Sequence, residues 1–307
     1  MLEKRLIGVI GAGRQGQNHI RDIISLGCDV IAADINEATL KQAKEKFNCQ
    51  TTMDYKEILN NTNITAVSIC APNSEHYKIA KEALESGKNI LIEKPMADTY
   101  SDAKSLIEIS KKAGKSICVG HVFRFNDAIV ELKRLVEQKY FGDNIFFIKF
   151  VWNNLEPIWN RDIIFDLASH PYDILHFIFN KTLENPSFIG APCRRETGNE
   201  VAFITGNIGK TLVSMDLSWV FPEKIRQIVI VGSEKAATIG CVEQTIDIYD
   251  FKTKSKTRLW HEANNALRAE LAHFINIAYA NIPTHSSGEV GAEIVKSLEE
   301  LRELSKK

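Results

Sequence analysis

The chain has 307 residues, more than one hydrophobic core usually serves, and this length predicts two compact units. Hydrophobic residues make up 44% and charged residues 25%, a composition typical of soluble globular proteins that excludes disordered and fibrous classes. The formal net charge of -1 comes from scattered charges. We therefore expect neither nucleic acid nor a membrane as a partner.

The cysteines and the N-terminus indicate the compartment. Six cysteines lie far apart without a C-x-x-C pair, which favours buried thiols in a reducing environment. The first residues are basic and then apolar, but the apolar stretch is too short and too rich in glycine for a signal or membrane segment. We expect a cytoplasmic protein. No His, Cys or carboxylate cluster has the spacing of metal ligands, so no metal site is predicted.

The first part of the chain alternates strand-length apolar runs with helical stretches, which predicts a parallel sheet wrapped by crossover helices. The expected strands are Leu6–Ile10, Val30–Ala33, a short one near Thr51, Ala66–Cys70, Ile90–Ile92 and Ile117–Val119. Asp54 and Glu57 form a capping box, and glycines at 27, 87 and 114 stand where helices should end. The predicted fold class is α/β, with a doubly wound Rossmann domain over residues 1–121.

After Arg124 the pattern changes to β-prone segments separated by turns. The expected strands are Asn144–Trp152, Ser187–Ile189, Glu200–Ile208, Thr211–Trp219, Gln227–Val231 and Thr245–Asp250. The expected helices are Asn126–Gln138, Asp166–Phe179, Asn265–Ala280 and Ser287–Ser305. Residues 122–307 should form an α+β domain with a large, mostly antiparallel open sheet. The uncovered apolar face of such a sheet must be buried, so we expect a homodimer or homotetramer.

A glycine-rich loop follows the first strand directly and opens a helix, as the G-x-G-x-x-G dinucleotide fingerprint requires. It reads Gly11, Ala12, Gly13, Arg14, Gln15, Gly16. Gly11 permits the tight turn, Gly13 lets the backbone approach a pyrophosphate, and Gly16 lets the helix pack on the strand. The loop predicts a bound dinucleotide.

Asp34 stands at the end of the second expected strand, where a carboxylate accepts hydrogen bonds from the adenosine ribose. Its charge would repel a 2′-phosphate, and Ile35 and the residues after it supply no arginine to offset that charge. The cofactor is therefore predicted to be NAD rather than NADP. The alternative is that the glycines only turn the chain and that Asp34 caps a helix.

Glu93, Lys94 and Pro95 follow the fifth expected strand at the carboxyl edge, where open α/β sheets bind ligands. An ammonium at this place can orient a substrate hydroxyl and stabilise a developing alkoxide. The alternative for Lys94 is a solvated lysine at a strand exit.

The motifs, in this order and spacing, resemble the Gfo/Idh/MocA family of glucose-fructose oxidoreductase, inositol dehydrogenase and rhizopine-catabolism proteins. The resemblance covers nearly the whole chain. It rests on GAGRQG, Asp34, Ala71-Pro72-Asn73 with His76, Gly87-Lys88-Asn89-Ile90, Glu93-Lys94-Pro95, Gly120–Phe125 and Asp166–Asp173. It implies catalysis by Lys94 and cofactor contacts from Ala71, Pro72, Asn73, His76 and Glu93. His76 is also interpreted as a structural residue.

Asp166 and His170 are four residues apart, so a helix would place both on one face. Histidine titrates near neutral pH and can take a hydroxyl proton, with Asp166 orienting the ring. Pro171 suits a first helical turn, so the helix is expected to start near Ser169. A structural role for His170 is the alternative on spacing alone. The resemblance implies the catalytic set Lys94, Asp166 and His170, and a substrate site formed by these and Arg124.

Two positions stay open. Asp173 is interpreted either as a structural charge near the start of a helix or as a substrate contact. Many relatives carry a glycine pair before the aspartate, whereas this chain has Trp159, Asn160 and Arg161. Trp159 and Arg161 are candidates for phosphate contacts, or else a core tryptophan and a surface arginine. The form Asp-Leu-Ala-x-His is similar to that of nucleotide-sugar 3-dehydrogenases of the family.

The predicted function is an NAD(P)-dependent oxidoreductase that transfers hydride between nicotinamide and a hydroxyl carbon of a sugar, cyclitol or nucleotide sugar. UDP-sugar 3-dehydrogenase and inositol 2-dehydrogenase types are the specific expectations. The alternatives are a dinucleotide-binding regulator without turnover and an NAD-dependent glycosidase of the same family.

Overall fold

The computed structural model describes residues 5–158, 162–260, 263–280 and 284–306. The chain divides into two compact units. The first consists of Met1–Val122 and Leu267–Val295, and the second of Phe123–Ala266 and Lys296–Lys307. The first division lies one residue from the expected boundary. The expectation that everything after residue 121 belongs to the second domain needs correction, because Leu267–Val295 returns to the first unit.

The return has a packing reason. Helix α8 (Ala266–Ala280) buries Leu271, Phe274 and Ile275 in the same apolar cluster as Ile7 of the first strand. The isolated bridge between Cys118 and Ser287 adds a short antiparallel contact near the edge of the sheet. Sequence periodicity shows that a helix has apolar residues to bury, but not which sheet they cover.

The first unit contains a six-stranded parallel sheet in the order β3-β2-β1-β4-β5-β6 within the described residues. Its strands are β1 (Leu6–Ile10), β2 (Asp29–Ala33), β3 (Gln50–Thr52), β4 (Ile64–Ile69), β5 (Asn89–Glu93) and β6 (Ile117–Gly120). The strand order reverses between β1 and β4, and ligands of doubly wound sheets bind at the carboxyl edge beside such a reversal. The predicted Rossmann domain is confirmed.

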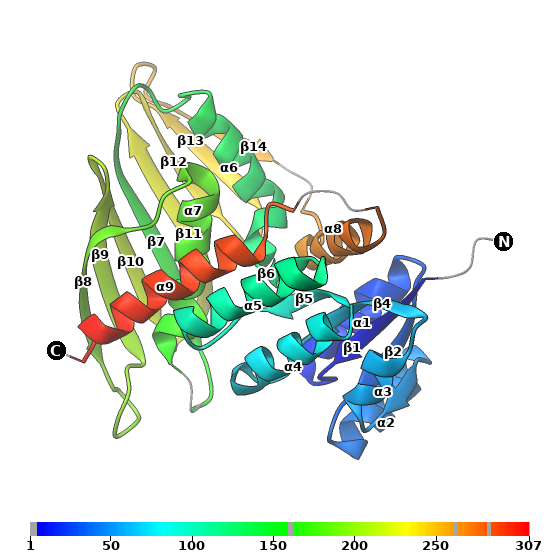
Figure 1. Cartoon of the computed structure of the whole chain (residues 1–307). Helices are drawn as coiled ribbons and strands as arrows, with labels where there is room; N and C mark the ends of the chain where they lie inside the picture. The colour runs from blue at the N-terminus through cyan, green and yellow to red at the C-terminus, as the bar shows by residue number, and fades with distance from the viewer. Residues whose placement is uncertain (1–4, 159–161, 261–262, 281–283, 307) are drawn as a thin grey trace. The chain divides into compact units, whose positions relative to one another are not determined.

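Helices cover both faces of this sheet. They are α1 (Arg14–Ser25), α2 (Glu37–Phe47), α3 (Tyr55–Asn60), α4 (Asn73–Glu85) and α5 (Tyr100–Ala113), with α8 from later in the chain. Helices α1, α2 and α8 share one buried cluster with Ile7 and Val9 of β1. Gly8, which points to the other face, packs against Ile58 of α3. Figure 1 shows α4 and α5 lying side by side.

The second unit contains an eight-stranded sheet in the order β14-β13-β12-β11-β7-β10-β9-β8 within the described residues. Its strands are β7 (Ile145–Leu155), β8 (Glu184–Ala191), β9 (Val201–Ile208), β10 (Thr211–Ser218), β11 (Val220–Gly232), β12 (Lys235–Gly240), β13 (Thr245–Asp250) and β14 (Ser255–Trp260). Only the pairing of β7 with β10 is parallel among these strands. The predicted mostly antiparallel sheet is confirmed, although β12 and β14 were not expected.

The helical segments between β6 and β8, and the last helix, lie near their expected places. They are η1 (Val122–Phe125), α6 (Asp127–Glu137), the π-helical turn η2 (Ile164–Ala168), α7 (Ser169–Phe179) and α9 (Gly288–Leu304). Helix α7 begins at Ser169, directly after the π-helical turn, and Pro171 falls in its first turn. The predicted start of this helix is confirmed.

The two faces of the eight-stranded sheet differ sharply. Ile148, Phe150 and Trp152 of β7 are buried, as are their cross-strand partners Val213, Met215 and Leu217 of β10. The opposite face carries Phe147, and its cross-strand partner Leu212 is 64% exposed. One side of the sheet is therefore core, and the other bears apolar side chains in contact with solvent.

No helix in the described ranges is both long enough and apolar enough to cross a membrane. All six cysteines lie in described residues. Cys28, Cys49, Cys118 and Cys241 are buried, Cys70 is partly exposed and Cys193 is exposed. The expectation of buried thiols is therefore correct for four of the cysteines and wrong for Cys193.

Candidate functional site

The three glycines of the loop between β1 and α1 differ in what surrounds them. Gly11 has a φ of 91°, and an added Cβ would lie 2.6 Å from the main chain of Cys70. At Gly16 an added Cβ would collide with the main-chain oxygen of Gly11. At Gly13 it would meet no atom within 4 Å. Two glycines are thus required by packing, and the third leaves open space in front of the loop.

This space fits a dinucleotide phosphate. Gly13 is the N-cap of α1 and makes no side-chain cap, and the first turn of α1 contains no acidic residue. The exposed residues Gly13, Arg14 and Gln15 therefore present main-chain N–H groups and positive helix-dipole charge to an anion. The chain's own atoms fit the cofactor that the sequence predicts.

Asp34 lies directly after β2 and is bonded to the glycine loop. Its Oδ2 accepts a hydrogen bond of 2.7 Å from the main-chain nitrogen of Ala12, and its Oδ1 accepts one of 2.9 Å from Asn36. Helix α2 is capped instead by Asn36, whose side chain accepts from the main-chain nitrogens of Ala38 and Thr39. The interpretation of Asp34 as a helix cap is therefore wrong. Ile35 beside it is 88% exposed.

Glu93 ends β5 beneath the loop, and its carboxylate collects three hydrogen bonds. Its Oε1 accepts from Gln15 Nε2 at 2.8 Å and lies 3.0 Å from His19 Nε2. Its Oε2 accepts from the main-chain nitrogen of Lys94 at 3.2 Å. The Glu-Lys-Pro corner is thus joined to helix α1, and the peptide between Lys94 and Pro95 is cis.

The electrostatics of this pair agree with its geometry. Burial opposes the charged form of Glu93, but hydrogen bonds from His19 and Gln15 lower its pKa to about 2. Burial also opposes the charged form of His19, whereas the Cys70 sulfur and the Glu93 carboxylate raise the pKa of His19 well above its ordinary value. Both shifts favour an ion pair between His19, whose side chain has no exposed area, and Glu93, whose side chain is 15% exposed.

His19 was not among the residues that the sequence singled out. The available signal was its position, because it lies four residues after Gln15 and four before Ile23, on the face of α1 that enters the core. A histidine on such a face is usually structural, and no local pattern shows that its partner is 74 residues away.

His76 bridges the ends of β4 and β5. Its Nδ1 lies 2.8 Å from the main-chain oxygen of Pro95, and its Nε2 lies 2.9 Å from that of Ala71. Its side chain has no exposed area, and burial lowers its pKa. These contacts give His76 a role in holding the corner. Pro72 and Asn73, in contrast, are exposed at the start of α4.

In the second unit, Asp166 lies in the π-helical turn and His170 in the first turn of α7, and both are partly exposed. The ring of His170 packs edge-on against Phe123, with centroids 5.1 Å apart, and lies 6.4 Å from the Trp152 ring. This aromatic contact fixes the orientation of the imidazole. π-Helical turns are frequent at functional sites.

Arg226 of β11 is a further cation of this region that sequence reasoning missed. It is the cross-strand partner of Trp152, and its Cζ lies 5.7 Å from the Trp152 ring centroid. Its Nη2 donates to Asn154 Oδ1 at 2.7 Å. Burial lowers the pKa of Arg226, while the nearby Asp166 carboxylate opposes this change. The arginine therefore lies within electrostatic reach of Asp166.

Arg124 was expected at the substrate, and the structure places it in the core instead. It is 4% exposed, and its Nε donates to Asp173 Oδ1 at 2.7 Å. Its Nη2 lies 3.2 Å from Nδ1 of His176. Asp173 is also buried and pairs with Arg124. Of its two interpretations, a structural charge or a substrate contact, the structure therefore supports the structural charge. Burial behind its own partners keeps Arg124 from a substrate, which corrects the expectation.

Trp159 and Arg161, the candidate phosphate contacts, lie outside the described residues. Lys94 belongs to the first unit, whereas Asp166 and His170 belong to the second.

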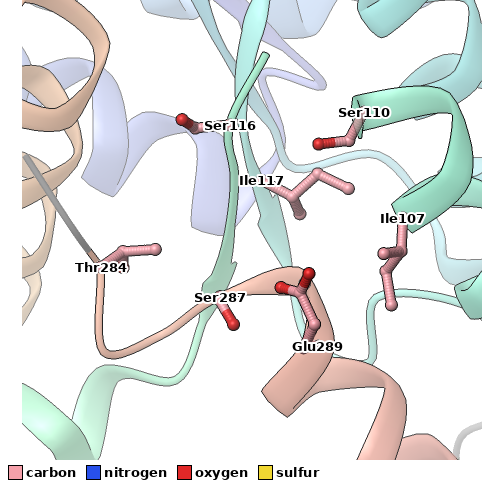
Figure 2. A pocket seen from close by; sticks show the side chains of 8 residues that line it. Ile107, Ser110, Ser116, Ile117, Thr284, Ser287 and Glu289 are labelled. Carbon is pink, nitrogen blue, oxygen red and sulfur yellow. The ribbon is translucent and has the colours of Figure 1, made fainter. Parts of the chain in front are cut away.

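A small pocket of about 140 Å³ lies in the first unit, and Figure 2 shows hydroxyl groups and Glu289 around it. It adjoins Ile117, the first residue of β6, whereas Gly120 at the other end of β6 pairs with Glu93. The pocket is therefore at the opposite end of the strand from the Glu-Lys-Pro corner. Glu289 pairs with Lys111 at 3.2 Å, so we assign the pocket no part in nucleotide binding.

Comparison with known proteins adds a family match. Residues 5–121 match the model of an oxidoreductase family with an NAD-binding Rossmann fold. UDP-N-acetylglucosamine 3-dehydrogenase of Acidithiobacillus ferrooxidans is 24% identical over 308 residues, which are 96% of this chain and 95% of that protein. Inositol 2-dehydrogenase of Salmonella paratyphi B is 26% identical over 182 residues, which are 57% of this chain and 54% of that protein.

Solved structures share the fold over the whole chain. The Acidithiobacillus ferrooxidans UDP-N-acetylglucosamine 3-dehydrogenase superposes with a TM-score of 0.88 at 22% identity, covering 99% of each chain. An oxidoreductase from Agrobacterium radiobacter, crystallised with NAD+, L-tartaric acid and magnesium, superposes with a TM-score of 0.87 at 18% identity. That superposition covers 99% of this chain and 97% of the other. The second unit therefore shares its fold with these proteins.

Proposed function

Because the chain belongs to the Gfo/Idh/MocA family of oxidoreductases, we propose that it is an NAD-dependent dehydrogenase acting on a hydroxyl carbon of a sugar-like substrate. The observation that carries the proposal is the open space in front of Gly13, beside a carboxylate at Asp34 that excludes a 2′-phosphate. NAD, when bound, supplies the hydride acceptor for the oxidation, or the donor as NADH for the reverse reaction.

The cofactor is held by residues at the carboxyl edge of the first sheet. The glycine loop with Ala12, Arg14 and Gln15 binds the pyrophosphate, and Asp34 and Ile35 bind the adenosine. Ala71, Pro72 and Asn73 line the same edge, where His76 holds their segment against the corner at Pro95.

Lys94, Asp166 and His170 form the catalytic set in this proposal. A ring nitrogen of His170 takes the proton of the substrate hydroxyl, because a histidine titrates near the working pH. Asp166, on the same side of the helical segment, stabilises the imidazolium. The Lys94 ammonium stabilises the developing alkoxide oxygen.

Among sugar-like substrates, two observations favour a nucleotide sugar over a neutral cyclitol. A relative that aligns over nearly its whole length is named for UDP-N-acetylglucosamine, whereas the inositol dehydrogenase aligns over about half of its length. The positive charge of Arg226, a partly exposed residue near Asp166, also suits an anionic substrate. Oxidation at C3 of a UDP-sugar is the specific form of the proposal.

The open sheet of the second unit supports a homo-oligomer. Ile189, Phe203, Leu212, Phe147 and Tyr249 share one face by their strand register and are 40% to 74% exposed. A second copy of the chain is the natural cover for a self-complementary apolar face. We also place the protein in the cytoplasm, because its cysteines are mostly buried thiols.

The test measures absorbance of reduced nicotinamide with NAD+ or NADP+ and a panel of UDP-sugars, inositols and free sugars. We expect turnover with NAD+ and a UDP-sugar, and a loss of kcat of roughly a hundredfold or more in Lys94→Met and His170→Gln. Lys112→Met, at an exposed position of α5, is the control.

Full activity in both site variants would overturn the residue assignment. Binding of NAD+ without turnover on any substrate would favour a regulator. Cleavage of a p-nitrophenyl glycoside without net reduction of NAD+ would favour the glycosidase reaction.

A further inference from the structure

The ion pair of His19 and Glu93 connects three segments that are distant in the sequence: α1, β4 and the end of β5. His19 comes from α1, and its Nδ1 lies 2.8 Å from Ser68 Oγ of β4. Glu93 ends β5, and its carboxylate also accepts from Gln15, which belongs to the glycine loop and to the first turn of α1. The same carboxylate holds the main-chain nitrogen of Lys94. One carboxylate, that of Glu93, therefore contacts both the glycine loop and the Glu-Lys-Pro corner.

The burial of these groups makes the arrangement rigid. The His19 side chain has no exposed area, and the Glu93 side chain is 15% exposed. A carboxylate at this depth is stable only when its oxygens are bonded, and removal of one partner leaves a buried charge uncompensated. If the Glu93 carboxylate turned away from His19 toward a ligand, it would incur this free-energy cost of an uncompensated charge. Its oxygens are also already occupied by three donors on the protein.

We propose that His19 is a positioning residue of the proposed dehydrogenase and that Glu93 is its anchor rather than a direct cofactor ligand. The protonated imidazole holds the Glu93 carboxylate, which holds the main chain at Lys94 and the side chain of Gln15. Occupation of the glycine loop is therefore mechanically linked to the position of Lys94. The kinetic part of this inference rests on the proposed function, and the binding part does not.

The first experiment follows the His19 ring by NMR in the full-length protein and needs no turnover. His19→Gln assigns the resonance. We expect an imidazolium at neutral pH in the wild type and a neutral ring in Glu93→Gln, because the opposite charge is lost. We also expect addition of NAD+ to shift the His19 resonance, and the shift to shrink in Gln15→Ala. Lys111→Gln, whose ion pair with Glu289 is at the other end of β6, should leave the shift unchanged.

The second experiment compares kinetics with folding. We expect His19→Gln and Glu93→Gln each to lower kcat by roughly ten- to a hundredfold per folded molecule, with a smaller change in KM for NAD+. The double variant should be no worse than the poorer single variant, because both remove the same interaction. Thermal unfolding gives the folded fraction.

The inference would be overturned if His19 were neutral in the wild type at neutral pH. It would also be overturned if the His19 resonance did not shift when NAD+ binds. Variants with reduced thermal stability but unchanged kcat per folded molecule would overturn it as well, since this result describes a structural pair only. If the wild type turns over no substrate, the proposed function fails, and the NMR titration still decides whether the loop and the corner are linked.

Discussion

Asp34 Oδ2 and the main-chain nitrogen of Ala12 are joined by a hydrogen bond of 2.7 Å. The carboxylate expected to select the cofactor therefore also holds the second residue of the phosphate loop. The proposed cofactor choice and the geometry of the loop therefore involve the same side chain.

Asp34→Asn should consequently change cofactor preference. Removal of the charge weakens the bond to the ribose diol and ends the repulsion of a 2′-phosphate, so the ratio of NAD+ to NADP+ affinity should fall by roughly tenfold or more. Fluorescence titration with both cofactors measures the ratio. Asp54→Asn is the control, because Asp54 caps α3 after a neighbouring strand. An unchanged ratio would show that Asp34 does not face the ribose.

Gly13→Ala and Gly16→Ala should separate binding from stability. A methyl group at Gly13 enters open space, so the thermal midpoint should stay and NAD+ affinity should fall by about tenfold or more. A methyl group at Gly16 collides with the Gly11 oxygen, so unfolding should become easier by about 1–3 kcal/mol. Thermal unfolding and NAD+ titration of both variants test this. Normal NAD+ affinity in Gly13→Ala would place the phosphate elsewhere.

The ion pair of His19 and Glu93 predicts a pH window of stability. The folded-state pKa of His19 is raised, so its contribution is full below 6.5 and is lost as pH rises through that higher pKa. The pKa of Glu93 is lowered from 4.5 to about 2, so its contribution is full above 4.5 and is lost as pH falls toward 2.

The difference in unfolding free energy between wild type and Glu93→Gln should therefore be largest between pH 4.5 and 6.5. Urea unfolding across the pH range measures it. Lys41→Gln, which removes an exposed pair with Glu45, should give a small difference that does not vary in this way. If the difference in unfolding free energy between wild type and Glu93→Gln also did not vary with pH, His19 and Glu93 would not be charged at the same time.

The apolar face of the eight-stranded sheet predicts association. Light scattering should show a dimer or tetramer at micromolar concentration, and Leu212→Glu or Phe203→Glu should produce smaller species, because each places a charge on the exposed face. Val130→Glu, at a 45% exposed position on α6, is the control. A monomeric wild type would contradict the prediction.

Local patterns were sufficient for much of the first unit. The strand Leu6–Ile10 lies where it was predicted, and the glycine loop follows it. The prediction succeeds because the apolar run, the glycine motif and the start of the helix follow one another directly in the sequence. The same holds for Thr245–Asp250 in the second unit. The strands Lys235–Gly240 and Ser255–Trp260 were not predicted, because their small and polar residues do not form the apolar pattern of a strand.

The sequence by itself determined the fold class and the glycine loop and predicted the carboxylate expected at the ribose, because each depends on residues close together in the chain. Tertiary structure alone decided that Arg124 is a buried partner of Asp173 and that Leu267–Val295 returns to the first unit. It also decided that His19 holds Glu93. These contacts join residues 49 or more positions apart, and a distant partner leaves no periodic trace in the sequence.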